Sequence, residues 1–164
     1  MISSVDHLIV VVRELNKAII DYKKILGISP CWKGKHSELG TINAVFNLEN
    51  IYLELLSPDS RGSGTEFINS LLDKKGDHLA GIALGTDNIE LVKETLNKEG
   101  HEVDITSGQA TSEEKGSIRR WKNIFLPTSL SKELFIFIIE HTEGSFSEYE
   151  YEDISRVKKL DHVV

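Results

Sequence analysis

Three polar side chains interrupt stretches of sequence that otherwise have the apolar character of buried strands. Glu54 lies within "IYLELL", Glu140 lies within "FIFIIEH", and His7 begins the run "HLIVVV". A carboxylate in such a strand is costly to bury unless a cation pairs with it or a metal binds it. The alternatives are a strand-end glutamate that reaches solvent or an arginine, and a histidine that is hydrogen-bonded at a strand edge.

A second group of candidate residues comes from the stretch "SIRRWKN" and the residues after it. Strand alternation places one set of side chains on a single face, with Arg120 on the other. That set would form a ligand-binding wall with a cation for an anionic substrate group, an amide and two rings: Arg119, Trp121, Asn123 and Phe125. Alternatively, the two arginines neutralise Glu54 and Glu140 without any metal.

The elements that must position these side chains follow a repeated order of strand, helix and three strands. In the first unit we expect a strand over 8–12, a helix within 14–27 that Gly27 ends, and strands near 28–32, 41–48 and 51–56. In the second unit we expect a strand over 79–85, a helix over 86–100, and strands near 102–105, 118–126 and 134–140. Asp87 and Glu90 suggest a capping box for the second helix.

This repeat predicts an α+β domain, residues 1–142, made of two βαβββ modules. Module one covers 5–58, a linker with a short helix near Thr65 covers 59–77, and module two covers 78–142. Each module should form a curved four-stranded sheet with its helix on one face. The other faces of the two sheets would then form a curved mixed sheet around a central cleft for a small molecule.

The same stretches resemble a known group of proteins. "VDHLIVVVRELNKAIIDYKKILG", "NIYLELLSP", "GIALGTDNIELVKETLNKEGHEV" and the pair "GSIRRWKNIFLP" and "FIFIIEHT" are similar to segments of the vicinal oxygen chelate superfamily. This is the glyoxalase and bleomycin-resistance group, and the resemblance to its glyoxalase-like domain branch runs from about Val5 to Thr142. The superfamily contains lyases, isomerases, dioxygenases, epimerases and binders without activity, so the resemblance predicts fold more sharply than reaction.

The resemblance also implies a metal site. By position, His7, Glu54 and Glu140 match ligands of a divalent ion such as Zn, Ni, Fe, Mn or Co, and Glu140 would be the catalytic proton carrier. The remaining ligand position falls on Gly81. His78 is three positions away, and an odd offset directs it to the opposite face unless a bulge re-aims it.

Three functions therefore stay open. The first is a metal-dependent lyase, isomerase or dioxygenase, which the retained His7, Glu54 and Glu140 favour. The second is a metal-free binding module of the bleomycin-resistance kind, and the third is the non-catalytic half of a longer protein. Gly81 favours the second and third. His141 should face away from the cleft if Glu140 faces into it, and His36 is assigned to a surface segment.

Composition excludes several other classes. The chain has 164 residues and a formal net charge of −7, which argues against a nucleic-acid or anionic-membrane partner. Its longest apolar runs are far too short to cross a bilayer. A single cysteine cannot form an internal disulfide, and no signal pattern opens the sequence, so we expect a cytoplasmic protein.

The final residues "LDHVV" repeat the "VDHLIV" near the start, with Asp161 and His162 in the places of Asp6 and His7. We read 143–164 as an acidic connector followed by the start of a further module, so that the natural protein would be longer. A coincidental match is the alternative. The terminal strand should pair with a sheet edge of its own chain or of a neighbour in a homodimer, and His162 should stay out of the first cleft.

Overall fold

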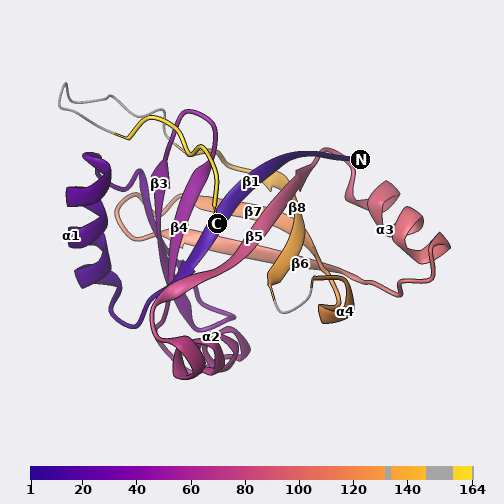
Figure 1. The fold of residues 1–164 in the computed structure, drawn as a ribbon, viewed down its shortest axis with the longest axis horizontal. Helices are drawn as coiled ribbons and strands as arrows, with labels where there is room; N and C mark the ends of the chain where they lie inside the picture. Colours follow the sequence, from indigo (N-terminus) through magenta and orange to yellow (C-terminus); the bar gives the residue numbers. More distant parts are fainter. Residues whose placement is uncertain (132–133, 147–156, 164) are drawn as a thin grey trace.

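The computed structural model describes residues 1–131, 134–146 and 157–163. In this part of the chain the strands are β1 (Ile2–Val11), β2 (Trp32–His36), β3 (Thr41–Asn47), β4 (Tyr52–Pro58), β5 (His78–Thr86), β6 (Ile105–Ser112), β7 (Ile118–Phe125) and β8 (Phe135–Glu143). The helices are α1 (Leu15–Leu26), α2 (Ser63–Lys75), α3 (Ile89–Lys98) and α4 (Thr128–Ser131). Figure 1 shows their arrangement. No helix among the described residues is long and apolar enough to cross a membrane.

The eight strands close into a barrel in the order β1-β4-β3-β2-β6-β7-β8-β5. The two halves of this order are equivalent, because in each half the first strand pairs in parallel with the fourth, and the third lies between the fourth and the second. The prediction of two βαβββ modules in an α+β fold with a curved mixed sheet is therefore confirmed. The closure of that sheet into a full barrel goes beyond the prediction.

The modules join at two unequal seams. At the first seam β1 and β5 pair antiparallel along their whole length, from Ile2 opposite Thr86 to Val11 opposite His78, with three register shifts. At the second seam β2 and β6 share only two residue pairs, one of which is Lys35 opposite Thr111. The barrel is therefore closed by many backbone pairs at the β1–β5 seam and by few at the β2–β6 seam.

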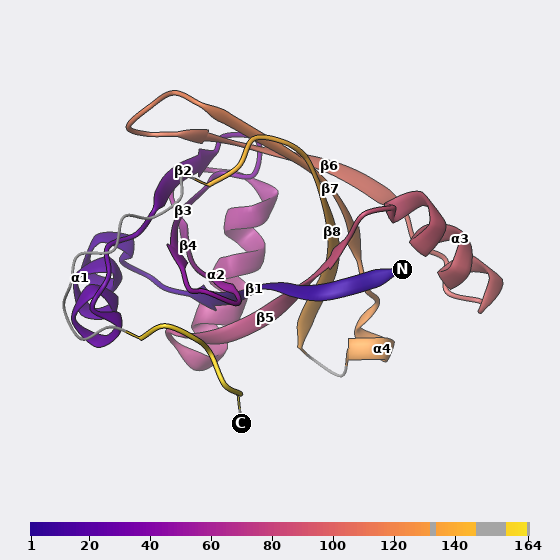
Figure 2. The same cartoon turned by 90° about the horizontal axis from the view of Figure 1, so that it is seen from above.

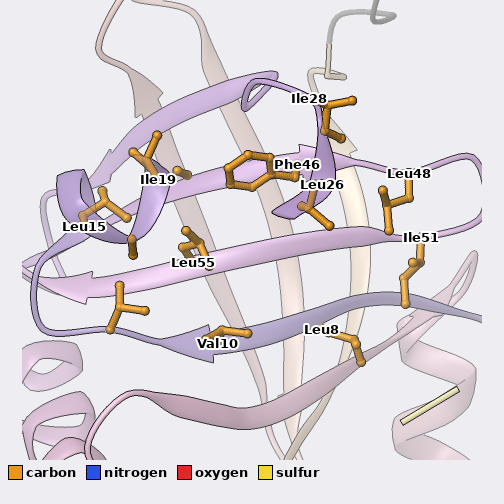
Figure 3. Packing of buried hydrophobic residues seen from close by; sticks show 13 residues of the cluster. Leu8, Val10, Leu15, Ile19, Leu26, Ile28, Phe46, Leu48, Ile51 and Leu55 are labelled. Carbon is orange, nitrogen blue, oxygen red and sulfur yellow. The ribbon is translucent and has the colours of Figure 1, made fainter. Parts of the chain in front are cut away.

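Helices α1 and α3 lie outside the barrel (Figure 2). The apolar stripe of α1 packs on the outer face of module one, where Phe46 and Leu55 are fully buried (Figure 3). Gly27 ends α1 as predicted, since it adopts a left-handed conformation with φ of 69° and its N–H bonds to the Lys23 carbonyl. A smaller cluster around Ile89 and Ile124 joins α3 to module two.

Helix α2, from the predicted linker, packs against β1, β4 and β5 and crosses one end of the barrel (Figures 1 and 2). Its Ile68 and Leu72 are buried against Val11 and Ala80. The linker therefore supplies the floor of the space that the strands surround.

Several predicted element bounds are wrong. The strand expected near 28–32 is β2, which begins at Trp32, and the strand expected near 102–105 is β6, which begins at Ile105. Both strands contain a glycine against which an indole lies: a Cβ added to Gly34 would be 2.2 Å from Trp32 Nε1, and one added to Gly108 would be 2.4 Å from Trp121 Nε1. Gly34 lies in "KGK", a stretch that predicts a turn, but both glycines are strand positions that make room for a tryptophan.

The described C-terminal residues, 157–163, lie against module one. Val157 donates its N–H to the Leu26 carbonyl, the Glu49 N–H bonds to the Lys158 carbonyl, and the Asn50 side chain bonds to both backbone groups of Leu160. Leu160 also packs against the core of module one. The predicted terminal strand is thus an extended segment along the β3–β4 turn. Most of the predicted acidic connector, 147–156, lies outside the described residues.

Candidate functional site

A cavity of about 400 Å³ occupies the barrel interior. This volume lies in the usual range for pockets that bind small organic molecules. Most of the wall is apolar or aromatic, and polar side chains gather toward one end of the barrel. The polar lining residues are Asp6, His7, His36, Asn43, Tyr52, Glu54, Arg119 and His141, among others.

His7 is the centre of the polar end. Its Nδ1 lies 2.6 Å from Asp6 Oδ1 and its Nε2 lies 3.3 Å from Glu54 Oε2. Because a carboxylate only accepts, both ring nitrogens donate and the ring is an imidazolium. Burial alone would lower the pKa of His7, but the hydrogen bonds and charges of the two carboxylates outweigh burial and raise this pKa to about 9.

Glu54 is held in its ionised form from two sides. Burial would raise its pKa, but the hydrogen bond and charge of His7 and the 2.6 Å bond donated by Asn43 Nδ2 lower it below the usual value. The sequence predicted that His7 and Glu54 would converge, and the short distance between them confirms that geometry.

Arg119 continues the polar network on the other side of Asp6. Its Nη2 lies 3.3 Å from His141 Nδ1, and His141 Nε2 lies 3.1 Å from Asp6 Oδ2. A guanidinium can only donate, so His141 Nδ1 accepts the hydrogen bond from Arg119. His141 Nε2 therefore carries the ring proton and donates a hydrogen bond to Asp6. A continuous chain of hydrogen bonds thus runs from Arg119 through His141, Asp6, His7 and Glu54 to Asn43.

Arg119 is buried, with 8% of its surface exposed, and aromatic rings cover its guanidinium. Its Cζ lies 3.5 Å from the ring centre of Phe146 and 5.8 Å from that of Trp32. Burial lowers the pKa of Arg119, and Tyr52 and Asp6 offset part of this effect. Its Nε has no hydrogen-bond partner among the described residues. Arg119 therefore places a cation at the cavity wall, while its Nε is covered by other protein atoms.

The other end of the cavity is a cluster of phenylalanines. Phe135 stacks on Phe125 with ring centres 5.8 Å apart, and it also contacts Phe67 of α2 at 4.9 Å and Phe137 at 5.4 Å. Along β7 the lining therefore changes from a cation at Arg119 to a ring at Phe125, so that the cavity is amphiphilic along its length.

The predicted ligand-binding face does line the cavity. Arg119, Trp121, Asn123 and Phe125 all border it. Arg120 is on the outer face and forms an ion pair with Glu143. The alternation expected for β7 is therefore confirmed, while a role of these residues in substrate binding stays a prediction.

The predicted position of Glu140 is wrong. Its carboxylate accepts a hydrogen bond from the Ile89 N–H at the start of α3, outside the barrel, and the inward residues of β8 are its neighbours Ile139 and His141. His141 was expected to face away only if Glu140 faced the cleft; that condition is not met, and His141 lines the cavity. Both faces of this strand are apolar before residue 140, so alternation alone could not identify the inner one.

The other residues considered for the third metal ligand do not fill that place. A Cβ on Gly81 would meet the Phe135 carbonyl oxygen at 2.2 Å, so this position has no room for a side chain. A register shift does occur in β1–β5 near Gly81, but His78 Nδ1 bonds to the Gly76 carbonyl oxygen, and His78 does not border the cavity. The terminal His162 is exposed and bonds to Asp161, outside the cavity as expected.

The residues present do not fit the predicted metal centre. Of its three ligands, His7 and Glu54 meet but Glu140 is outside the barrel, and both nitrogens of His7 are engaged by carboxylates. Within the described part of the chain, no group of three His, Cys, Asp or Glu side chains is arranged to hold a metal ion.

Sequence reasoning also missed part of the cavity lining. His36 was assigned to the surface, but it is buried, bonds to Thr41 Oγ1 at 2.9 Å, and its pKa is lowered by burial. Trp32 and Asn43 were not singled out. Alternation groups Trp32 with His36 along β2 and Thr41 with Asn43 along β3, and because His36 pairs with Thr41 and Gly34 with Asn43, both groups face the cavity.

Comparison with known proteins agrees with this architecture. Residues 5–163 match the model of the glyoxalase-like domain family, and the chain belongs to that family, as its resemblance to the vicinal oxygen chelate superfamily predicted. No curated protein matches the chain significantly.

Solved structures show the same fold at low identity. A variant of Streptomyces coelicolor methylmalonyl-CoA epimerase in complex with 2-nitronate-propionyl-CoA is 18% identical, with a TM-score of 0.66 over 85% of this chain and 94% of that chain. Methylmalonyl-CoA epimerase from Mycobacterium tuberculosis is 19% identical, with a TM-score of 0.65 over 87% and 90%. A hypothetical protein from Bacillus halodurans C-125 is 18% identical, with a TM-score of 0.70 over 87% and 96%. At these identities the likeness extends to the fold alone.

Proposed function

We propose that this glyoxalase-like domain is a binding module for a small amphiphilic anion, and that it binds this ligand without a metal. The observation that carries the proposal is Arg119, a largely buried guanidinium that borders the polar end of an aromatic cavity. A carboxylate on the ligand would pair with the charge of this guanidinium, and its apolar part would lie against Phe125, Phe135 and Phe137.

The ionisation of the polar end favours binding over proton transfer. A general acid or base works best when its pKa is near the working pH. Here the pKa of His7 is raised to about 9 and that of Glu54 is lowered, so that each stabilises the charged form of the other. The pair therefore acts as a fixed polar wall. A metal-dependent enzyme that uses His7, Glu54 and Glu140 is the weaker hypothesis, because the Glu140 side chain lies outside the barrel.

Calorimetric titration with 4-phenylbutanoate tests the proposal, because this probe has one carboxylate and one ring. Replacing Arg119 with Gln removes the cation and should weaken binding by roughly 10- to 100-fold, the usual value of a hydrogen bond to a charged group. The matched control is Arg120→Gln, one residue away and outside the barrel, which should stay within about 2-fold of the unmodified protein.

The unmodified protein provides a test that does not depend on the folding of a variant. It should bind 4-phenylbutanoate at least about 10-fold more tightly than the neutral 4-phenylbutanamide. Equal affinities for the two compounds, equal effects of the two arginine substitutions, or no binding of the carboxylate would contradict the proposal.

A further inference from the structure

One polar atom of the cavity wall faces the interior without a partner in the described part of the chain. His36, at the end of β2, is buried and borders the cavity, and its Nδ1 lies 2.9 Å from Thr41 Oγ1. The described atoms that lack a partner and are closed off from any probe are Trp32 Nε1, Asn43 Oδ1 and Arg119 Nε. His36 Nε2 is not one of them, so this nitrogen keeps accessible surface toward the cavity.

The proton on the His36 ring follows from its neighbour Thr41. Among the described residues, the buried Thr41 hydroxyl has its hydrogen bond with His36 alone. Since a buried donor is nearly always satisfied, the hydroxyl donates to Nδ1, and Nε2 carries the ring proton. Burial lowers the pKa of His36, the charge of Glu54 offsets part of this effect, and the charges of Arg119 and His7 lower the pKa further. At pH 7 His36 is therefore a neutral ring that presents one N–H donor to the cavity.

His36 lies between the cation and the phenylalanines along the cavity. Its ring meets that of Trp121 edge to face, with ring centres 5.7 Å apart, and Trp121 is the inward residue of β7 between Arg119 and Phe125. The order along β2 is the same, because Trp32 at its start is the residue beside the Arg119 guanidinium. A ligand with its carboxylate at Arg119 and its apolar part among the phenylalanines therefore passes His36 with its middle.

We infer that His36 donates a hydrogen bond to a carbonyl group in the middle of the ligand, so that the ligand is a carboxylate with an oxo or amide group before its apolar part. The inference rests on the proposed function, which sets the direction of the ligand through Arg119. A carbonyl oxygen suits this donor because it accepts without a charge. A second carboxylate would be repelled by Glu54, whose charge already acts on the ring.

Probes of equal chain length test the inference by calorimetric titration of the unmodified protein. 4-Oxo-4-phenylbutanoate has a carbonyl next to its ring, 2-oxo-4-phenylbutanoate has one next to its carboxylate, and 4-phenylbutanoate has neither. The 4-oxo compound should bind about 3- to 10-fold more tightly than 4-phenylbutanoate, the usual effect of a neutral hydrogen bond. The 2-oxo compound should gain less, because its carbonyl stays at the Arg119 end of the cavity.

A variant and a spectrum assign the preference to His36. His36→Phe keeps a ring and removes the N–H, so the affinities for the 4-oxo compound and for 4-phenylbutanoate should become equal, whatever change the two share. The matched control is His162→Phe, at an exposed residue outside the cavity, which should retain the preference. In the unmodified protein, nitrogen NMR should show the His36 ring protonated at Nε2, and the Nε2 signal should shift more with the 4-oxo compound than with 4-phenylbutanoate.

The inference and the proposed function fail in different ways. Equal affinities of the unmodified protein for the 4-oxo compound and 4-phenylbutanoate, an equal gain for the two oxo compounds, or a His36 ring protonated at Nδ1 would overturn the inference and leave the proposed function standing. A failure of all these carboxylates to bind would overturn both.

Discussion

His7 is the residue whose chemistry departs most from its ordinary behaviour. Its imidazolium lies between the carboxylates of Asp6 and Glu54, with a pKa raised from 6.5 to about 9. A group whose pKa is higher in the folded than in the unfolded state stabilises the fold fully below the unfolded value, and this contribution is lost as pH rises through the folded value. We therefore expect the free energy of unfolding to fall between pH 6.5 and 9, by roughly 3 kcal/mol for a shift of this size.

Chemical denaturation across that pH range, with His7→Gln beside the unmodified protein, measures this effect. The variant should be less stable at pH 6.5 and should show a much flatter pH dependence, because glutamine does not titrate. NMR titration of the His7 ring should give a midpoint near 9. A midpoint near 6.5 would show that the two carboxylates do not hold the ring in its charged form.

At this scale the sequence predicted the site only partly. Glu54 was identifiable because a carboxylate inside an apolar strand needs a partner, and His7 is that partner. Glu140 met the same criterion, but it caps a helix from the outer face of β8. Local sequence could not separate the two cases, since the partner in each case belongs to a distant segment.

At the scale of the element, the N-cap residue of helix α3 is Asn88, one residue after the predicted cap Asp87. The Asn88 side chain, not that of Asp87, accepts the hydrogen bond from the Leu91 N–H. Replacing Asn88 with Ala should lower the free energy of unfolding by about 1 kcal/mol, as is usual for the loss of such a cap. Asp87→Ala is the matched control and should cost less than about 0.5 kcal/mol. Urea denaturation would measure both, and a larger loss for the Asp87 variant would restore the predicted cap.

Elements with a clear period were predicted well, and those with internal glycines were not. The bounds of α1 agree with its apolar stripe and with its glycine stop, both local signals. In contrast, the predicted bounds of β2 and β6 are displaced, and for β2 the reason is Gly34, because "KGK" predicts a turn until the tryptophan that packs on this glycine is known. The contacts of Trp32 with Gly34 and of Trp121 with Gly108 form only when the strands are in place in the sheet.

For the whole molecule, the inequality of the two seams predicts where the barrel opens. The amide of Glu113 bonds to the Lys33 carbonyl beside the two-pair β2–β6 seam, whereas β1 and β5 are paired along their length. Local opening breaks few hydrogen bonds between β2 and β6, and many between β1 and β5. Hydrogen exchange followed by NMR should therefore show faster exchange of the Glu113 amide than of the β1 amides that pair with β5. The reverse order would mean that the barrel opens along β1 and β5.

The repeat itself was predicted from the sequence, because each module has its own order of strand, helix and three strands. Closure into a barrel was not, because it depends on which edges of the two modules meet. The floor supplied by α2 was also missed, since the linker was assigned no part in the cavity.

The indoles of Trp32 and Trp121, which pack on Gly34 and Gly108, determine the intrinsic fluorescence of the protein. The chain contains two tryptophans, Trp32 and Trp121, and both border the same cavity. Intrinsic fluorescence excited at the red edge of indole absorption therefore originates entirely from the cavity wall, with no background from the outer surface. The emission maximum and its quenching by small solutes report the polarity and the occupancy of the barrel interior directly. The protein thus contains its own chromophores for screening ligands without a label.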